Sequence, residues 1–278
     1  MKKVIAMLLA GVLCAGLLTA CGGGSSAKDK TEEEGTTFTV GFDAEYPPYG
    51  FKDEETGDYT GFDLELAEEL CARRGWTLVK QPIDWNSKDM EINSGAIDCL
   101  WNGMTYTGRE EDYTWTEPYV DNSIVFVVNA DSDIQTKADL AGKSVVAQQE
   151  SSADTALTND PGDGSNDENL NLCKSFGRYE AIDTYNNAFM NMATGVYDAI
   201  AVDIGVAQFQ LKANEGKYRI LDEPLSKEQY AIAFKKGNTE LRDMVQETLN
   251  EMAADGTVDK IVAKYADYNL PDMLIIGK

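Results

Sequence analysis

The 278-residue chain contains no histidine, and this absence excludes much of the usual chemistry of protein sites. Catalytic triads use an imidazole as their base, and many zinc sites use imidazole nitrogens as ligands. General acid–base catalysis near neutral pH also loses its most common side chain. The sequence therefore excludes His-based triads, His-ligated zinc sites and imidazole bases.

Positive charge is the second scarcity, because 24 lysines and arginines stand against 48 aspartates and glutamates. The resulting formal charge of −24 repels phosphate backbones and anionic lipid headgroups. We expect no nucleic-acid partner, and we interpret the acidity mainly as a means to solubility. An acidic ligand is disfavoured at long range, although one buried arginine can outweigh a surface field that salt screens.

Cysteine is sparse as well, and the five cysteines form no pattern that predicts a metal site. Cys71, Cys99 and Cys173 follow residue 21, and their spacing contains neither a CxxC pair nor a zinc knuckle. Cys71 lies on an apolar helical stripe and Cys99 in an apolar run, which favours buried hydrophobic roles. We expect no metal and no cofactor.

Long apolar runs are limited to Ile5 to Leu18, which is too short to span a bilayer comfortably. Lys2 and Lys3 precede this run, as in a signal peptide of residues 1–20. Leu18-Thr19-Ala20-Cys21 resembles the lipobox of bacterial lipoproteins, which implies cleavage before Cys21 and a lipid on its sulfur. The alternative is an ordinary signal peptide followed by an incidental cysteine.

Residues 21–36 are rich in glycine, serine and charge, a composition typical of flexible tethers. With the lipobox they predict a protein held at the extracellular face of the cell membrane through its lipid anchor only. In a cell with an outer membrane that location is the periplasm. No later stretch of the sequence is long and apolar enough to span a bilayer.

Beyond residue 36, strand patterns alternate with helical patterns. The expected strands are Thr37 to Phe42, Leu78 to Ile83, Ala96 to Trp101, Ile124 to Val128, Ser144 to Gln148, Tyr197 to Val202 and Tyr230 to Phe234. The expected helices are Phe62 to Arg74, Ser87 to Gly95, Tyr185 to Thr194, Ile204 to Ala213, Leu241 to Met252 and Val258 to Tyr265. Residues 46–51 predict a loop and residues 155–171 an exposed excursion. The alternation predicts an α/β fold, and its repetition on either side of about residue 122 predicts two lobes.

Several fragments in a fixed order resemble the polar amino-acid family of periplasmic-type binding proteins, the solute receptors of ABC transporters. They are GFDAEYPPYGF (41–51), GFDLELAEEL (61–70), SGAIDCLWNGMTYTGRE (94–110), TEPY (116–119), DLAGKSVVAQ (139–148), YDAIAVD (197–203), YAIAFKKGN (230–238) and DGTVDKIVAKY (255–265). Each fragment alone is weak, and the ordered set covers nearly all of residues 37–265.

The resemblance implies a type II periplasmic-binding-protein-like fold, with two open sheets flanked by helices and a two-segment hinge. The first lobe would comprise residues 37–123 and 227–278, and the second lobe residues 124–226. The ligand, a free polar amino acid, would bind between lobes that close on it. The implied partners are this amino acid and an ABC transporter permease, and the implied state is a monomer.

A free amino acid carries both charges, so a cleft that buries it needs a fixed cation and a fixed anion. Arg109 matches the family arginine after the NGMT-like segment, and its planar guanidinium suits a carboxylate. Asp203 ends an apolar strand where open α/β sheets place ligands, and it matches the family aspartate for the ammonium group. The alternatives are a solvated surface arginine and a simple helix cap.

Other candidate ligand contacts follow strands of the two predicted lobes. In the first lobe, Asn102, Gly103 and Thr105 follow a strand, where Gly103 permits close backbone approach and the Thr105 hydroxyl suits the carboxylate. In the second lobe, Ser151 and Ser152 match a family pair whose amides suit an anion. Two neighbours depart from the family, namely Glu150 in place of a frequent glycine and Ala153 in place of a polar residue.

Asp43, Tyr46, Trp85 and Gln148 match family positions that contact the ligand or line the pocket. Further candidates for an aromatic wall, each of which could instead pack in the core, are Trp101, Tyr49 and Phe51. Because no second cation is evident beside Arg109, aspartate and glutamate are less favoured as ligands. A neutral polar amino acid, glutamine or cystine-like, is preferred slightly over a basic one.

Two other classes remain open. The fold of cyclohexadienyl dehydratase is similar to the one implied here. An enzyme of that kind would need Asp43, Glu150 or Asp203 as its base. A ligand-sensing domain of a receptor would need a membrane span and a signalling domain after the fold, whereas this chain ends at Lys278. We expect a non-enzymatic binding protein with no catalytic residues.

Overall fold

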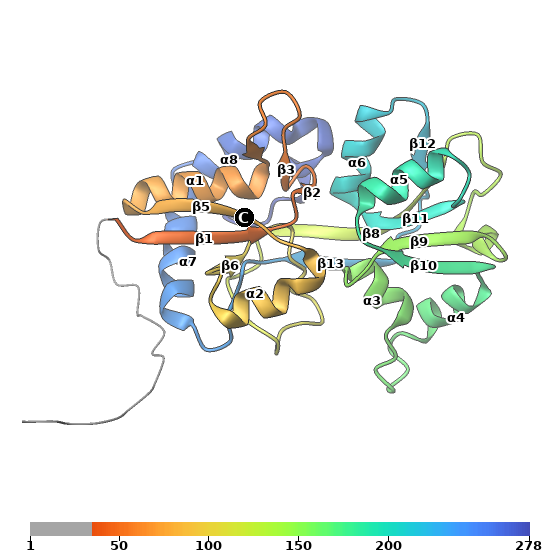
Figure 1. Ribbon diagram of the computed structural model, residues 1–278, viewed down its shortest axis with the longest axis horizontal. Coiled ribbons are helices and arrows are strands. Elements are labelled where there is room, and N and C mark those ends of the chain that lie inside the picture. The colour runs from red at the N-terminus through yellow and green to blue at the C-terminus, as the bar shows by residue number, and fades with distance from the viewer. Residues whose placement is uncertain (1–34) are drawn as a thin grey trace, which may run out of the picture.

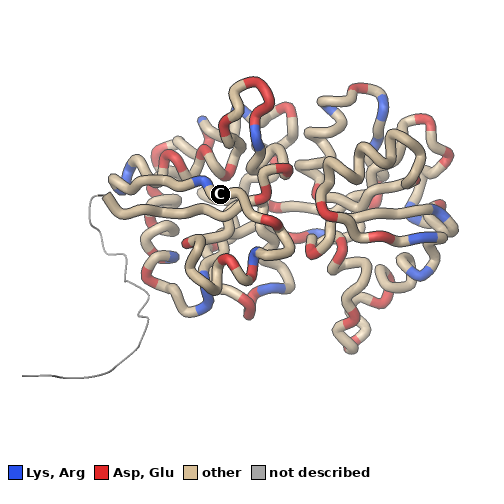
Figure 2. The backbone as a smooth tube through the Cα atoms, in the orientation of Figure 1, with Lys and Arg blue, Asp and Glu red and all other residues tan. Residues whose placement is uncertain are grey.

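The computed structural model describes residues 35–278 as two lobes side by side (Figure 1). The predicted signal peptide, Cys21 and nearly all of the tether lie outside the described residues. Within residues 35–278, no helix is both long and apolar enough to cross a membrane. Acidic residues occur along the backbone of both lobes, as Figure 2 shows, in keeping with the net charge.

The first lobe is built on a sheet of five strands in the order β5-β1-β6-β14-β7. These strands are β5 (Thr77–Pro82), β1 (Thr37–Phe42), β6 (Cys99–Leu100), β14 (Ala233–Phe234) and β7 (Thr114–Trp115). The first three run parallel, and β14 runs antiparallel to both of its neighbours. Helices α1 (Phe62–Arg74), α7 (Thr239–Ala254) and α8 (Thr257–Val262) pack on one face, and α2 (Lys88–Ser94) packs on the other. The chain's last helix is α9 (Leu270–Met273).

Strand β1 and helix α1 show how the sequence dictates this lobe. Alternate residues Phe38, Val40 and Phe42 point into the core that α1 covers. Helix α1 presents buried residues at helical spacing and ends at Gly75, whose φ of 67° provides the left-handed C-cap. Both elements have the bounds that the sequence predicts.

The second lobe is built on a sheet in the order β10-β9-β11-β8-β12, with β13 also paired to β8. Its strands are β10 (Arg178–Ile182), β9 (Ser144–Gln148), β11 (Ala199–Asp203), β8 (Val120–Asn129), β12 (Tyr218–Ile220) and β13 (Ser226–Tyr230). Helices α3 (Ser152–Thr158) and α4 (Asp167–Ser175) pack on one face, and α5 (Tyr185–Ala193) and α6 (Ile204–Ala213) pack on the other. The apolar run of β8 is buried because both faces of this strand are covered.

The two lobes are joined by β8 and by the segment from β13 to β14 (Figure 1). The sequence predicts one strand from Tyr230 to Phe234, and the structure corrects this to two. Tyr230 still pairs with β8, whereas Ala233 and Phe234 pair with β6 in the first lobe. The chain changes partner sheets here, so a single apolar run serves two lobes.

The excursion expected over residues 155–171 is also corrected, because most of it is helical. Ser151 caps α3 by accepting a hydrogen bond from the amide of Asp154, at 3.1 Å. Leu157 and Leu170 are buried, and the Asn166 side chain donates to two carbonyl oxygens across the connecting loop. These local contacts order a segment whose composition alone indicates a loop.

A small hairpin sheet extends the first lobe toward the second. It comprises β2 (Glu45–Tyr46), β3 (Gly50–Lys52) and β4 (Tyr59–Thr60), with the two prolines of the predicted loop in its first turn. Phe51 of β3 contacts Phe209 of α6, with ring centroids 5.6 Å apart. The hairpin therefore forms part of the contact between the lobes.

Candidate functional site

A pocket between the lobes gathers nearly all of the residues that the sequence singles out. Its cavity volume is about 20 Å³. Ten predicted residues line it, namely Tyr46, Trp85, Asn102, Gly103, Thr105, Arg109, Gln148, Ser151, Ser152 and Asp203. The eleventh, Asp43, lies next to the pocket, where its carboxylate accepts a hydrogen bond from the Gln148 amide nitrogen at 2.8 Å.

Arg109 reaches the pocket from the loop between β6 and β7. The Trp115 indole donates to the Arg109 carbonyl oxygen at 3.0 Å and fixes the backbone of this loop. The guanidinium makes only a long contact of 3.4 Å to the carbonyl oxygen of Glu150 and a weak one to the Met104 sulfur. Within residues 35–278, no acidic side chain pairs with Arg109, so its charge remains available to an anion.

Asp203 reaches the pocket from the junction of β11 and α6. It occupies the N-cap position of α6, yet its carboxylate makes no capping hydrogen bond. One carboxylate oxygen instead accepts hydrogen bonds from Asn122 at 2.8 Å and from the Tyr230 hydroxyl. Burial raises the pKa of Asp203, while these donors oppose the shift. Among the described residues no lysine or arginine pairs with it.

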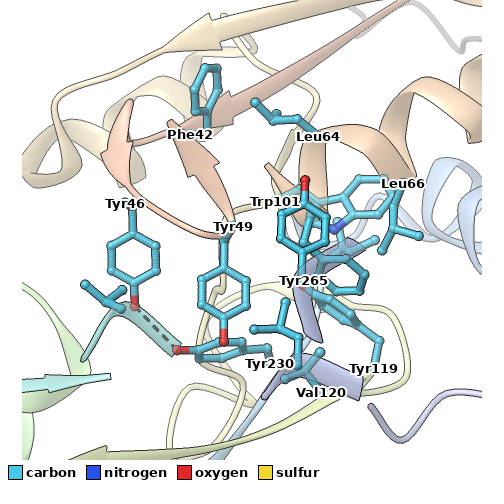
Figure 3. Close-up of a cluster of buried hydrophobic side chains, with 14 of the residues drawn as sticks. Phe42, Tyr46, Tyr49, Leu64, Leu66, Trp101, Tyr119, Val120, Tyr230 and Tyr265 are labelled. Carbon is cyan, nitrogen blue, oxygen red and sulfur yellow. Dashed lines mark hydrogen bonds between the residues drawn. The ribbon is translucent and has the colours of Figure 1, made fainter. Parts of the chain in front are cut away.

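Tyrosine side chains pack together next to Asp203, whose carboxylate accepts a hydrogen bond from the Tyr230 hydroxyl. Figure 3 shows Tyr46, Tyr49 and Tyr230 of this group. The hydroxyls of Tyr46 and Tyr230 are 3.4 Å apart, and Tyr49 packs edge-on against Tyr230 with ring centroids 5.2 Å apart. Of the aromatic candidates, Tyr46 and Trp85 line the pocket, whereas Trp101 and Tyr49 are fully buried in the core. Phe51 belongs to the hairpin contact described above.

Gly103 occupies a position that only glycine tolerates well. Its φ is +57°, and a Cβ there would lie 3.0 Å from the Tyr230 ring and 3.1 Å from the Tyr46 ring. The backbone can therefore turn at the pocket wall between two aromatic rings. The neighbouring Asn102 side chain accepts a hydrogen bond from the Asp43 amide at 2.9 Å and holds this wall to the strand below.

Two charged residues at the site escaped the sequence analysis. Glu228 of β13 is 8% exposed and accepts hydrogen bonds from Thr105 and Ser152 at 2.9 and 3.1 Å. Lys88 of α2 is 4% exposed, lies over the Trp85 ring and stands 3.7 Å from the Glu150 carboxylate. Strand alternation places Glu228 on the same side as buried Tyr230, which is the one signal that could have found it.

These contacts engage one hydroxyl that the sequence predicts to meet the ligand carboxylate. In the structure the Thr105 hydroxyl donates a hydrogen bond to Glu228. A hydroxyl has a single proton to donate, so Thr105 faces the pocket as an acceptor. The second cation that sequence inspection did not find, Lys88, is present but pairs with Glu150 across the lobes. Burial, followed by the nearby charge of Arg109, lowers the pKa of Lys88.

Two lobes are joined by two crossing segments, and the pocket between them holds a cation and an anion that have no oppositely charged partner in residues 35–278. These features define an interlobe solute-binding protein. The sequence profile of the bacterial extracellular solute-binding proteins, family 3, matches residues 38–268. The chain belongs to this family, and its fold is the predicted type II periplasmic-binding-protein fold.

Related proteins match nearly the whole chain. It is 29% identical to the probable amino-acid-binding protein YxeM of Bacillus subtilis, over 95% of each chain. It is 26% identical to the L-cystine-binding protein TcyA of the same organism, over 95% of this chain and 97% of that one. These relatives are binding proteins, which agrees with the expectation of a non-enzymatic role.

Solved structures show the same two-lobed architecture. The structure of Tv2483 bound to L-arginine matches with a TM-score of 0.77 and 28% identity, over 87% of this chain and 94% of that one. A substrate-binding protein of an ABC uptake transporter from Streptococcus pneumoniae, with bound histidine, matches with a TM-score of 0.75 and 29% identity. That match covers 82% of this chain and 92% of the other.

Proposed function

We propose that this protein is an extracellular receptor that captures a free polar amino acid between its lobes and delivers it to an ABC importer. The observation that carries the proposal is that Arg109 and Asp203 line the same pocket. Neither has an oppositely charged partner among the described residues. A zwitterion would neutralise both groups at once, with its carboxylate on Arg109 and its ammonium on Asp203.

The ligand we favour is a neutral polar amino acid, glutamine or cystine-like, with a basic amino acid as the next candidate. The Asp43 carboxylate already accepts hydrogen bonds from Gln148 and from the Glu45 amide, at 2.8 Å each. A neutral polar side chain can join this hydrogen-bond network at Asp43 or Gln148. Support for a cystine-like ligand also comes from TcyA, and support for a basic one from the arginine-bound and histidine-bound structures.

The proposal also covers the membrane anchor, the oligomeric state and the transport partner of the receptor. We infer that Cys21 carries a lipid, that residues 21–36 tether the lobes to the extracellular face of the membrane, and that the working form is a monomer. The partner is a permease of the ABC transporter type. Neither catalysis nor a cofactor is part of the proposed activity.

A thermal-shift screen of the twenty amino acids, cystine and ornithine tests the proposal directly. A ligand that binds only the folded state must raise the melting temperature, by an amount that grows with its concentration above Kd. Titration calorimetry of the best compounds then gives the affinity. A protein whose melting temperature no free amino acid shifts would not be the receptor proposed.

A further inference from the structure

The carboxylate of Glu228 connects both lobes and the segments that join them. Its Oε1 accepts hydrogen bonds from Thr105 of the first lobe at 2.9 Å and from Ser152 of the second lobe at 3.1 Å. It accepts a third from the Asn122 amide of β8, at 2.8 Å. Both hydroxyl residues also line the pocket, so one buried oxygen controls two groups that a bound ligand would meet.

We propose that Glu228 is a positioning residue that makes this end of the pocket selective for an amino group. This inference rests on the proposed function and identifies a residue that makes the proposed site selective. A hydroxyl has one proton and two lone pairs. Because Thr105 and Ser152 give their protons to Glu228, their remaining lone pairs accept hydrogen bonds. A ligand ammonium can supply those hydrogen bonds, and a carboxylate cannot.

Charge reinforces the same preference. Asn122 bridges Glu228 and Asp203, with its Nδ2 2.8 Å from an oxygen of each. Two buried carboxylates thus share one amide, and among the described residues neither pairs with a lysine or arginine. Their mutual repulsion is strong in a poorly solvated site, and a ligand ammonium placed beside Asp203 would offset it. The two carboxylates together therefore attract a positive charge more strongly than Asp203 alone would.

The protonation of Glu228 provides the readout. Burial, and then the charge of Asp203, raises the pKa of Glu228 to about 7. The charged and titratable groups around it are Asp203 on β11, Tyr49 on the hairpin, Tyr185 on α5, Tyr230 and Lys227 on β13, Asp121 on β8 and Asp272 on α9. Raising the pH through 7 deprotonates Glu228, so affinity for an ammonium group should rise over this range.

The test compares wild-type protein with Glu228→Gln and with Glu223→Gln, the same change at an exposed position five residues earlier. Calorimetry at pH 5.5 and 8 uses L-glutamine and L-arginine, each beside its analogue without the α-amino group, glutaramic acid and 5-guanidinopentanoic acid. We expect Glu228→Gln to weaken both amino acids about tenfold or more at pH 8, and far less at pH 5.5. The analogues and the Glu223→Gln variant should change little.

Folding stability without ligand gives an independent measurement. Because the folded-state pKa of Glu228 lies above its ordinary value, its contribution to stability is full at low pH and is lost as pH rises through about 7. Glu228→Gln should remove this part of the pH dependence of the melting temperature. Equal losses at both pH values, or equal losses for the analogues, would overturn the role of Glu228. Failure of the wild-type protein to bind either amino acid would instead count against the proposed function.

Discussion

Arg109 is the residue on which recognition of a ligand carboxylate depends. Its guanidinium lines the pocket without an acidic partner in residues 35–278, and Lys88 nearby is engaged with Glu150. We expect Arg109→Ala to reduce amino-acid affinity about 100-fold or more, because the ligand carboxylate would be buried without its partner. Arg109→Lys should recover only part of the loss, since an ammonium cannot form the two parallel hydrogen bonds.

Titration calorimetry of these variants measures the effect, and their melting temperatures without ligand show whether the fold is intact. Arg178→Ala is the matched control, because Arg178 is 53% exposed and pairs with Glu180 on the surface of the second lobe. Unchanged affinity in Arg109→Ala would remove the assignment of this residue to the carboxylate.

The Asp203 carboxylate is expected to raise the affinity for an amino acid and to lower the stability of the ligand-free fold. Asp203→Asn keeps the shape of the side chain and removes one of two buried carboxylates that repel each other. We expect the ligand-free protein to melt at a higher temperature, while amino-acid affinity falls because the ammonium loses its counterion. Loss of the Asp203 charge should also lower the pKa of Glu228 and shift the pH dependence of binding toward lower pH.

Calorimetry across pH 5 to 8 and thermal melts of the same samples check this prediction. A variant with lower stability and unchanged affinity would show that Asp203 serves the fold rather than the ligand. The two readouts therefore separate a structural role from a binding role in one pair of proteins.

The sequence locates most residues of the pocket but not their hydrogen-bond partners. Ten of the eleven expected positions line one cavity, because family motifs mark the loops that follow the strands. Glu228 and Lys88 match no contact position in those motifs, and their partners Thr105 and Glu150 are far from them along the chain. The direction of the Thr105 hydrogen bond likewise follows from Glu228, which is 123 positions away along the chain.

At the level of elements, the local sequence pattern predicts the bounds of a helix or strand well where the whole element packs in a single lobe. Strand β9 and helix α6 have the predicted bounds, as do β1 and α1. The prediction fails where tertiary partners change within a run, as between β13 and β14, or where side-chain bonds order a polar segment, as around Asn166. The strand expected over Ala96 to Trp101 shortens to Cys99–Leu100, the stretch that pairs with both β1 and β14.

The first turn of α6 offers a test of how this helix meets the first lobe. A Cβ on Gly205 would lie 2.5 Å from the Tyr49 hydroxyl and 2.9 Å from its ring. Alanine is a better helix former than glycine, by about 0.5–1 kcal/mol, so Gly205→Ala should not destabilise the second lobe itself. We expect it to hold the lobes apart, and therefore to weaken amino-acid binding without lowering the ligand-free melting temperature.

Small-angle scattering with saturating ligand measures closure, and calorimetry measures affinity. Adding Tyr49→Leu shortens the opposing side chain and should restore part of the closure. If Gly205→Ala closed and bound as the wild-type protein does, the contact between α6 and Tyr49 would have no part in binding.

On the scale of the whole molecule, polar contacts bridge the lobes around the pocket. Among them are Gln148 with Asp43, Thr105 with Glu228, and Lys88 with Glu150. The first two are largely buried, whereas the Glu150 side chain is 57% exposed and its partner Lys88 only 5%. We expect opening of the lobes to break these contacts, so that each of them slows the escape of a bound ligand.

Glu150 provides the clearest test of this closure, because its side chain forms an ion pair while its backbone adopts an unusual conformation, and the two can be changed separately. Its φ of 59° is a left-handed conformation that glycine adopts at little cost. Glu150→Gln removes the ion pair and keeps the strained backbone, and Glu150→Gly removes both. We expect both variants to release ligand several-fold faster in stopped-flow measurements at low salt, with the difference from wild type shrinking as ionic strength rises.

The two variants should differ in folding stability alone. Glycine relieves the left-handed strain, so Glu150→Gly should be about 1 kcal/mol more stable than Glu150→Gln in denaturant unfolding. Release rates that matched wild type in both variants would show that the ion pair does not hold the lobes together. Faster release in the glycine variant alone would assign the effect to backbone flexibility after Gln148, because only that variant frees the backbone while both remove the charge. The pair of substitutions thus separates electrostatic attraction between the lobes from the conformation of the segment that carries it.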